Sequence, residues 1–173
     1  IIFTGMWNMQ AGMQATELKD LKEHQLAVED RLQAEVRLAS AMAALVAEMP
    51  EAQQALADGD RDRLMQMFGT AFTRLKQDFG VRQMQFHRPP ALSFLRVHKP
   101  DKFDDDLSAV RPTIIKTNAD RKPVTGLDIG RFGLGLRGLV PMFHEGRHLG
   151  SVEFGMAFDE TFFKDFKGDY GID

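Results

Sequence analysis

The stretch from Gln14 to Met49 contains neither glycine nor proline, and residues with high helix propensity dominate it. It therefore predicts one long helix. Apolar residues recur at two heptad positions, interrupted by Gln25 and Glu35: Leu21, Val28, Met42 and Met49 share one, and Leu18, Leu32, Ala39 and Val46 share the other. A seam sustained over about four heptads predicts lengthwise packing against another helix. That helix is either a second copy, giving a parallel homodimer, or the chain's own second helix.

Shorter helices follow the long one. Pro50 ends the first helix, and a short helix is expected over residues 51–57. Asp60 is a good N-cap for a third helix that runs to about Phe79, and Gly80 is the residue type expected just past a helix end.

After Gly80 the apolar period changes from 3.6 to 2, which is typical of strands. Strands are expected over 81–87, 92–98, 124–129, 132–143 and 149–158, with a short helix over 107–118 and a last amphipathic turn after Asp159. The order predicts an α+β fold in which the long helix accompanies a central antiparallel sheet.

Length and composition exclude several classes of protein. The 173 residues are enough for one domain, and a formal net charge of -3 provides no basic field for nucleic acid. The absence of cysteine removes disulfides and thiolate chemistry but leaves the compartment open. No apolar run reaches the roughly 20 residues that cross a bilayer. Residues 1–13 are interpreted as a membrane-proximal segment or the remnant of a tag, and residues 14–173 as a single domain.

Basic and polar side chains on neighbouring predicted strands suggest a receptor for a small anion. Arg96 and His98 lie two apart, so a strand would point both the same way, and Arg137 lies on a strand that could neighbour theirs. Guanidinium and imidazole groups suit a carboxylate or similar anion. The candidate ligand-binding residues are Arg96, His98, Arg137, Gln85, His87 and Lys102. The alternative is a solvent-facing stripe, or arginines paired with Glu153 or with the run from Asp104 to Asp106.

Two short motifs are weaker than they first look. His144, Glu145 and His148 match H-E-x-x-H, the signature of a zinc hydrolase, but Gly146 and the flanking alternation favour a hairpin tip. Residues 133–138 match G-x-G-x-x-G without the helix that a dinucleotide site needs. No serine–histidine–acid arrangement can be argued. The sequence predicts a binding module, not an enzyme, with no metal and no cofactor; a purely structural dimerisation module is the third possibility.

Several motifs together resemble a known family. They are Gln83-Met84-Gln85-Phe86-His87, then Ser93-Phe94-Leu95-Arg96-x-His98-x-Pro100, then Gly135-Leu136-Arg137-Gly138, and finally Gly150-Ser151-Val152-Glu153-Phe154-Gly155. This combination is similar to the Cache family, in the double-Cache type found as the extracytoplasmic sensor of bacterial methyl-accepting chemotaxis receptors. The likeness covers most of the chain from about Leu18 onward.

The resemblance implies a long helix rising from the membrane, packed on a PAS-like antiparallel sheet whose pocket holds a small ligand. It implies a periplasmic domain of an inner-membrane chemoreceptor that pairs through its long helix. The same module occurs on histidine kinases and nucleotide cyclases, so the output domain stays open. A second Cache unit would be expected after Asp173, where this sequence stops.

Overall fold

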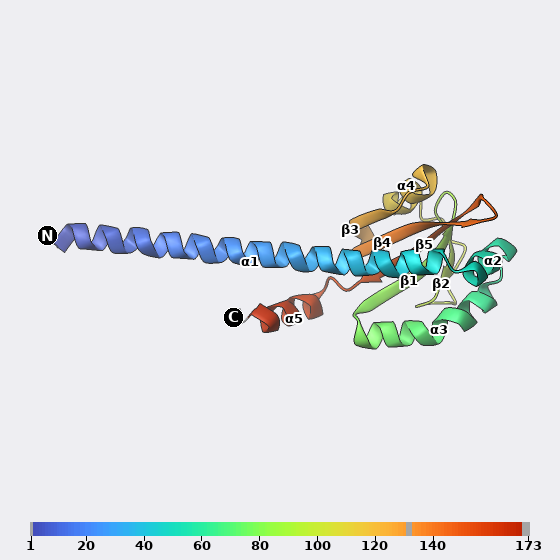
Figure 1. The fold of residues 1–173 in the computed structure, drawn as a ribbon, viewed down its shortest axis with the longest axis horizontal. Coiled ribbons are helices and arrows are strands. Elements are labelled where there is room, and N and C mark those ends of the chain that lie inside the picture. Colours follow the sequence, from blue (N-terminus) through green and yellow to red (C-terminus); the bar gives the residue numbers. More distant parts are fainter. Residues whose placement is uncertain (1, 131–132, 171–173) are drawn as a thin grey trace. The chain divides into compact units, whose positions relative to one another are not determined.

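A computed structural model of the chain describes residues 2–130 and 133–170 (Figure 1). Its helices are α1 (Ile2–Ala47), α2 (Pro50–Asp58), α3 (Arg61–Asp78), α4 (Pro112–Asp120) and α5 (Glu160–Tyr170). Its strands are β1 (Val81–Arg88), β2 (Leu92–Arg96), β3 (Val124–Gly130), β4 (Gly133–His144) and β5 (Arg147–Met156). The predicted α+β class with a long first helix is confirmed.

The chain divides after Ala34 into two units. The first unit is the N-terminal part of α1, where Leu18 and Leu21 are exposed along the predicted seam. Within the described residues, no helix is both long and apolar enough to cross a bilayer.

The second unit, from Glu35 onward, contains the sheet. Its five strands lie in the order β2-β1-β5-β4-β3, and every neighbouring pair is antiparallel. β3 pairs with β4, a hairpin joins β4 to β5, and β1 pairs with β5 across a long stretch of sequence. This order places β5 at the centre, with both of its edges hydrogen-bonded to neighbouring strands.

Helices cover the first face of the sheet, which is apolar. Phe86 of β1 lies on this face, and its ring centroid is 5.7 Å from that of Phe68 in α3. Gly138 of β4 faces the C-terminal part of α1: a Cβ atom there would lie 2.4 Å from the backbone nitrogen of Ser40. Ala39, Ala43 and Val46 are buried, so this end of the predicted seam packs within the chain. The seam's role in self-association stays a prediction.

The opposite face of the sheet is covered in part by α4, which contacts β3, β4 and β5 (Figure 1). Ile114 of α4 packs with Leu139 of β4 in a small apolar cluster that also holds Ala91 and Leu107. Around this cluster the face is polar, and most of its polar side chains are buried.

Two predicted boundaries were wrong in ways that matter for the site. The second strand ends at Arg96 and not at His98, because the Lys99 amide donates to the Arg96 carbonyl and closes a turn before Pro100. The short helix begins at Pro112 and not near Leu107, since proline lacks the amide hydrogen that a helix interior needs. Arg111 therefore becomes its N-cap residue.

Candidate functional site

Glu153 lies at the middle of the polar face, on the central strand β5. Alternation along β5 puts Val152 and Phe154 on the apolar face and Glu153 on the other. Glu153 is fully buried. A buried carboxylate is costly unless cations and hydrogen bonds compensate for its lost hydration, so its surroundings determine what this face can do.

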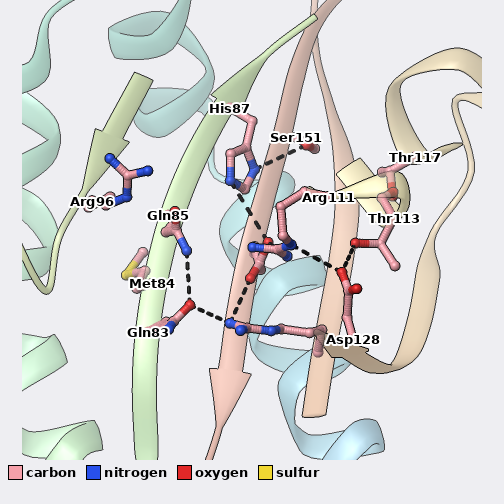
Figure 2. Close-up of polar contacts among 12 residues, drawn as sticks. Gln83, Met84, Gln85, His87, Arg96, Arg111, Thr113, Thr117, Asp128 and Ser151 are labelled. Carbon is pink, nitrogen blue, oxygen red and sulfur yellow. Dashed lines mark hydrogen bonds and ion pairs between the residues drawn. The ribbon is translucent and has the colours of Figure 1, made fainter. Parts of the chain in front are cut away.

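Two arginines share the Glu153 carboxylate. Arg111 Nη2 donates to Glu153 Oε2 over 2.6 Å, and Arg137 Nη1 donates to Glu153 Oε1 over 3.0 Å. Arg111 also donates from Nε to Asp128 Oδ2 over 3.0 Å, and the hydroxyl of Thr113 donates to the same oxygen. Figure 2 shows Arg111 and Asp128 lying toward one another across the face. Arg111 thus has two carboxylates, whereas Arg137 has only a share in one.

The electrostatics follow this unequal division. Burial lowers the pKa of Arg111, but Glu153 and Asp128 together raise it by more than burial lowers it, so the net change is a rise. Burial also lowers the pKa of Arg137, and there Glu153 compensates only in part, so the net change is a fall. The two guanidinium groups together outweigh the burial that raises the pKa of Glu153, and they bring that pKa down to about 2. Glu153 is therefore ionised, and Arg137 is the less compensated of its two partners.

His87 completes the inner end of this network without carrying charge. Burial, opposed by Glu153, lowers the pKa of His87 to about 3, so the imidazole is neutral at physiological pH. Its Nε2 lies 3.8 Å from Glu153 Oε2, too far for a hydrogen bond. Its Nδ1 is 3.5 Å from the Ser151 hydroxyl, at the limit of hydrogen bonding. His87 Nε2 is buried with no hydrogen-bond partner among the described residues.

A cavity of about 330 Å³ opens beside Arg137 at the outer end of the network. Its lining residues are Arg82, Gln83, Leu134, Gly135, Arg137, Met156, Ala157, Phe158 and Asp159. The guanidinium Nη1 is occupied, since it donates to Gln83 and Glu153. The Nε atom of Arg137 is buried and has no partner within the part of the chain that the structure describes. Nε itself lies beneath the cavity surface, but Arg137 lines the cavity, and an arginine with an unused donor can bind an anionic group.

Two glycines make room for this guanidinium. A Cβ atom at Gly155 would lie 2.6 Å from Arg137 Nη1, and one at Gly135 would lie 3.0 Å from Arg137 Cζ. The contact at Gly155 is closer than real Cβ atoms come, and the contact at Gly135 is at the tight end of what they show. The glycines therefore let Arg137 lie close against the backbone of β4 and β5.

The structure brings three of the predicted site residues into one network. Gln85 donates from Nε2 to Gln83 Oε1 over 3.0 Å, and Gln83 accepts from Arg137. His87 lies beside the same network, with its Nε2 3.8 Å from Glu153 Oε2 and no hydrogen bond between them. Figure 2 shows Gln83, Gln85 and His87 following one another along β1.

Arg96 lies next to this network but is engaged elsewhere. It is paired in register with Gln85 across the β1–β2 ladder, and Figure 2 shows it to one side of Gln85. Its two terminal nitrogens donate to Asp105 over 2.5 and 2.8 Å, and Nη1 also donates to the Lys102 carbonyl over 2.8 Å. Arg96 thus fixes the loop that follows β2, and the backbone of Lys102 takes part in that contact.

His98 lies apart from Arg137, against α3. Its Nδ1 is 3.2 Å from the Met84 carbonyl, and its ring centroid is 6.3 Å from that of Phe72. Burial lowers the pKa of His98. Because β2 has ended before it, His98 does not share the direction of Arg96, and it borders a groove between α3 and β1.

The H-E-x-x-H motif forms a hairpin tip, as predicted. His144 is the last residue of β4, Glu145 and Gly146 turn with positive φ, and Arg147 begins β5. His148 stacks on Phe143 with ring centroids 5.3 Å apart. The helix that would aim both imidazoles at one metal is replaced by a turn.

Sequence reasoning missed Arg111 and Asp128. Arg111 stands just before Pro112 and Asp128 alternates with Leu127 and Ile129, so neither lies in a recognisable motif. A single acidic residue in an otherwise apolar strand is a weak signal that the strand's face contains a polar cluster. Glu153 was foreseen as an alternative partner for an arginine, and it is the residue that both arginines contact.

Comparison with known proteins places this fold among bacterial sensors. The chain resembles the E. coli DcuS sensor domain with a TM-score of 0.58 and 16% identity, covering 79% of this chain and 97% of that one. It resembles the Campylobacter jejuni chemoreceptor Tlp3 sensory domain, solved with isoleucine bound, with a TM-score of 0.56 and 15% identity, covering 86% of this chain and 58% of that one. It also resembles the sensor domain of the V. cholerae histidine kinase DctB, with a TM-score of 0.57 and 11% identity, covering 79% of this chain and 55% of that one.

These structural similarities, at such low identity, establish the fold alone. The chain spans somewhat more than half of the Tlp3 and DctB domains. No curated protein matches the sequence. Residues 14–173, in contrast, match the profile of a family described as the double sensory domain of two-component sensor kinase, which covers far more than half of the chain. The chain therefore belongs to this dCache_3 family of sensory domains.

Proposed function

We propose that this chain is the extracytoplasmic, ligand-binding sensor domain of a bacterial membrane receptor, and that its ligand is a small anion such as a carboxylate. The observation that carries the proposal is Arg137: it is buried, the carboxylate to which it donates, Glu153, is shared with Arg111, and its Nε has no partner among the described residues. A bound carboxylate would supply both the missing acceptor and the missing negative charge.

In this proposal the other predicted residues support Arg137. Gln83 and Gln85 orient its guanidinium from β1, and His87 occupies the inner end as a neutral group. Arg96 and the Lys102 backbone hold the loop that borders the polar face. His98 belongs to the α3 side of the sheet.

Signalling would use the contact between β4 and α1. Gly138 follows Arg137 directly and packs against the backbone of Ala39 and Ser40. A ligand that binds one arrangement of β4 more tightly than another shifts the population of the two arrangements by its differential affinity. Because Gly138 is the next residue after Arg137, a change at Arg137 would reach α1 through this contact. Pairing of two copies through α1 would then pass the change on.

The receptor's output is a chemotaxis signal or, as the second candidate, a kinase signal. The chemotaxis output rests on the motif resemblance, and Tlp3 is described as a chemoreceptor. The kinase output is favoured by the family description, which names a two-component sensor kinase.

Ligand screening by thermal shift tests the proposal. A ligand at about 100 times its Kd stabilises the folded state by about 2.7 kcal/mol, enough for a clear rise in Tm. Small carboxylates are expected to raise the Tm of the unmodified chain and to leave the Tm of the Arg137→Gln variant unchanged. The matched control is Arg147→Gln, which removes an exposed arginine at the hairpin tip. Unchanged carboxylate binding by a folded Arg137→Gln protein would refute the site.

A further inference from the structure

The groove between α3 and β1, which His98 borders, lies on the α3 side of the sheet (Figure 1). Phe72 of α3 lies at the level of Met84, because its ring centroid is 6.3 Å from that of His98, whose Nδ1 is 3.2 Å from the Met84 carbonyl. One helical turn beyond Phe72 is Lys76, and two residues back along β1 from Met84 is Arg82. The groove therefore has one end near Lys76 and Arg82, and it extends past Phe72 toward the start of α3.

The end of the groove nearer the start of α3 is apolar. Met65, Gly69 and Phe72 line it, and their helical spacing puts them in one row along α3. A glycine inside a helix is destabilising relative to alanine. Packing within the chain does not demand one here: apart from the helix's own backbone, only the flexible end of Met65, at 3.3 Å, lies within 4 Å of an added Cβ among the described residues. Gly69 thus leaves a depression in this row at some cost to α3.

The other end of the groove is basic. Arg74, Lys76 and Arg82 line it, and none of the described lining residues is acidic. Lys76 opposes the negative end of the α3 dipole, which accounts for one of the three cations. Arg82 pairs with Asp159 over 3.3 Å, but both side chains are about half exposed, so this pair is weak. The positive charge at this end is thus compensated only in small part within the chain.

The groove is long and open to solvent. From Met65 to Lys76 the helix advances about 16 Å at about 1.5 Å per residue, a length that about five residues of an extended chain would span. Hydrogen-bonding side chains follow its rim: Thr70 and Gln77 are exposed, and His98 Nε2 can accept because Nδ1 donates to a backbone carbonyl. Such a groove suits a polypeptide, whose backbone can face both these groups and water. A fatty acid would leave much of its apolar chain exposed to water.

We propose that this groove docks an acidic segment of a partner protein. An apolar side chain of the segment would lie at Gly69, with its carboxylates at the basic end of the groove. Charge complementarity identifies this class of partner, since a basic patch steers acidic segments toward it and repels basic ones. The inference is independent of the proposed function, because Arg137 does not line this groove and lies on the opposite face of the sheet from Gly138, which packs on α1.

Short synthetic peptides test the proposal on the whole chain. The first has a central leucine and acidic residues at both ends, so that either chain direction brings a carboxylate to the basic end. The second replaces the leucine with serine, and the third replaces the acidic residues with their amides. Isothermal titration is expected to show binding of the first peptide, weakened by added salt, with the other two at least about tenfold weaker.

Two substitutions locate the binding, each with a matched control. Lys76→Gln should weaken binding of the first peptide by about two- to fivefold, the range of one exposed ion pair. Lys116→Gln, at an exposed lysine of α4, should leave it unchanged. Gly69→Ala should raise the urea midpoint of the chain and yet weaken the peptide, because the methyl group fills the depression. Gly168→Ala, at an exposed glycine of α5, should leave the affinity unchanged.

Each other result contradicts the proposal. No binding of the first peptide at millimolar concentration would exclude an acidic segment. Equal effects of Lys76→Gln and Lys116→Gln would show attraction to the overall charge and not to the groove. Equal binding of the leucine and serine peptides would remove the apolar anchor. Octanoate binding that is weakened by Lys76→Gln and by Gly69→Ala, without peptide binding, would identify the occupant as a lipid-like anion.

Discussion

Arg111 and Glu153 form a buried ion pair, with 2.6 Å between Nη2 and Oε2, that joins the start of α4 to the centre of the sheet. Both side chains are almost completely inaccessible to solvent. Arg137 uses the other oxygen of the same carboxylate, so a single negative charge compensates parts of two positive ones. The face that we propose as a ligand site is thus also a region on which folding depends.

Replacing Glu153 by glutamine should destabilise the fold severely. The substitution keeps the shape of the side chain but leaves Arg137 without a carboxylate and Arg111 with Asp128 alone. Breaking a buried pair typically costs about 3–5 kcal/mol. Urea unfolding at pH 7 measures the loss, and Glu145→Gln at the exposed hairpin tip should have almost no effect. Similar midpoints for the two variants would mean that the network is not stabilising.

The sequence predicted the order of the elements, because helix propensity and the change of period from 3.6 to 2 are local properties. It also placed Ser151, Glu153 and Gly155 on one face of their strand, and they do share it. It did not reveal that this face is buried. The Arg111–Glu153 contact spans 42 positions, and only the strand order that puts β5 between β1 and β4 brings α4 over Glu153.

Arg96 and His98 show a second limit of prediction from sequence, which concerns where a strand ends. Alternation predicts a shared direction only while the strand continues, and here the strand ends at Arg96. The bond from the Lys99 amide to the Arg96 carbonyl ends it, and this bond depends on a turn that apolar periodicity does not encode. A shift of two residues in a strand end was enough to separate two predicted partners.

Stability should fall between neutral pH and pH 4.5 because of His87. Its pKa is lowered from 6.5 to about 3 in the folded state, so below pH 6.5 the unfolded chain binds a proton that the folded chain does not. The contribution of His87 to the free energy of unfolding is therefore fully present above pH 6.5. It decreases by up to about 1.4 kcal/mol per pH unit as the pH falls toward 3. Glu153, with a pKa of about 2 against 4.5, adds a further loss only below pH 4.5.

The variant His87→Asn should reduce the slope of the stability profile between pH 6.5 and 4.5, where Glu153 does not yet contribute; the lowered pKa values of His98 and His148 act in the same direction and leave a smaller slope. Chemical unfolding at a series of pH values measures the slope. His24→Asn, which removes an exposed histidine from α1, should keep the slope of the unmodified chain. If His87→Asn retains that slope as well, the pH dependence comes from other groups.

Gly138→Ala should destabilise the contact between β4 and α1. The added Cβ would lie 2.4 Å from Ser40 N and 2.6 Å from Ala39 C, and backbone atoms cannot move aside as the end of a side chain can. The expected loss is at or above the upper end of the about 1–3 kcal/mol typical of overpacking. Gly168→Ala in α5 has nothing within 4 Å of the new methyl group and should be neutral or slightly stabilising. Denaturant unfolding compares them, and an equal effect would place α1 farther from β4.

Gly155→Ala should act specifically through Arg137. The new Cβ would lie 2.6 Å from Arg137 Nη1, so the guanidinium must shift away from Glu153. Because a flexible side chain can move, the expected loss is moderate, about 1–3 kcal/mol. In an Arg137→Gln background the shorter side chain no longer reaches the methyl group, and most of this loss should disappear. A double-mutant cycle in urea measures the coupling, expected at about 0.5–3 kcal/mol for residues in contact. Purely additive effects would mean that Gly155 and Arg137 do not touch, and the close fit that positions the proposed anion receptor would have to be abandoned.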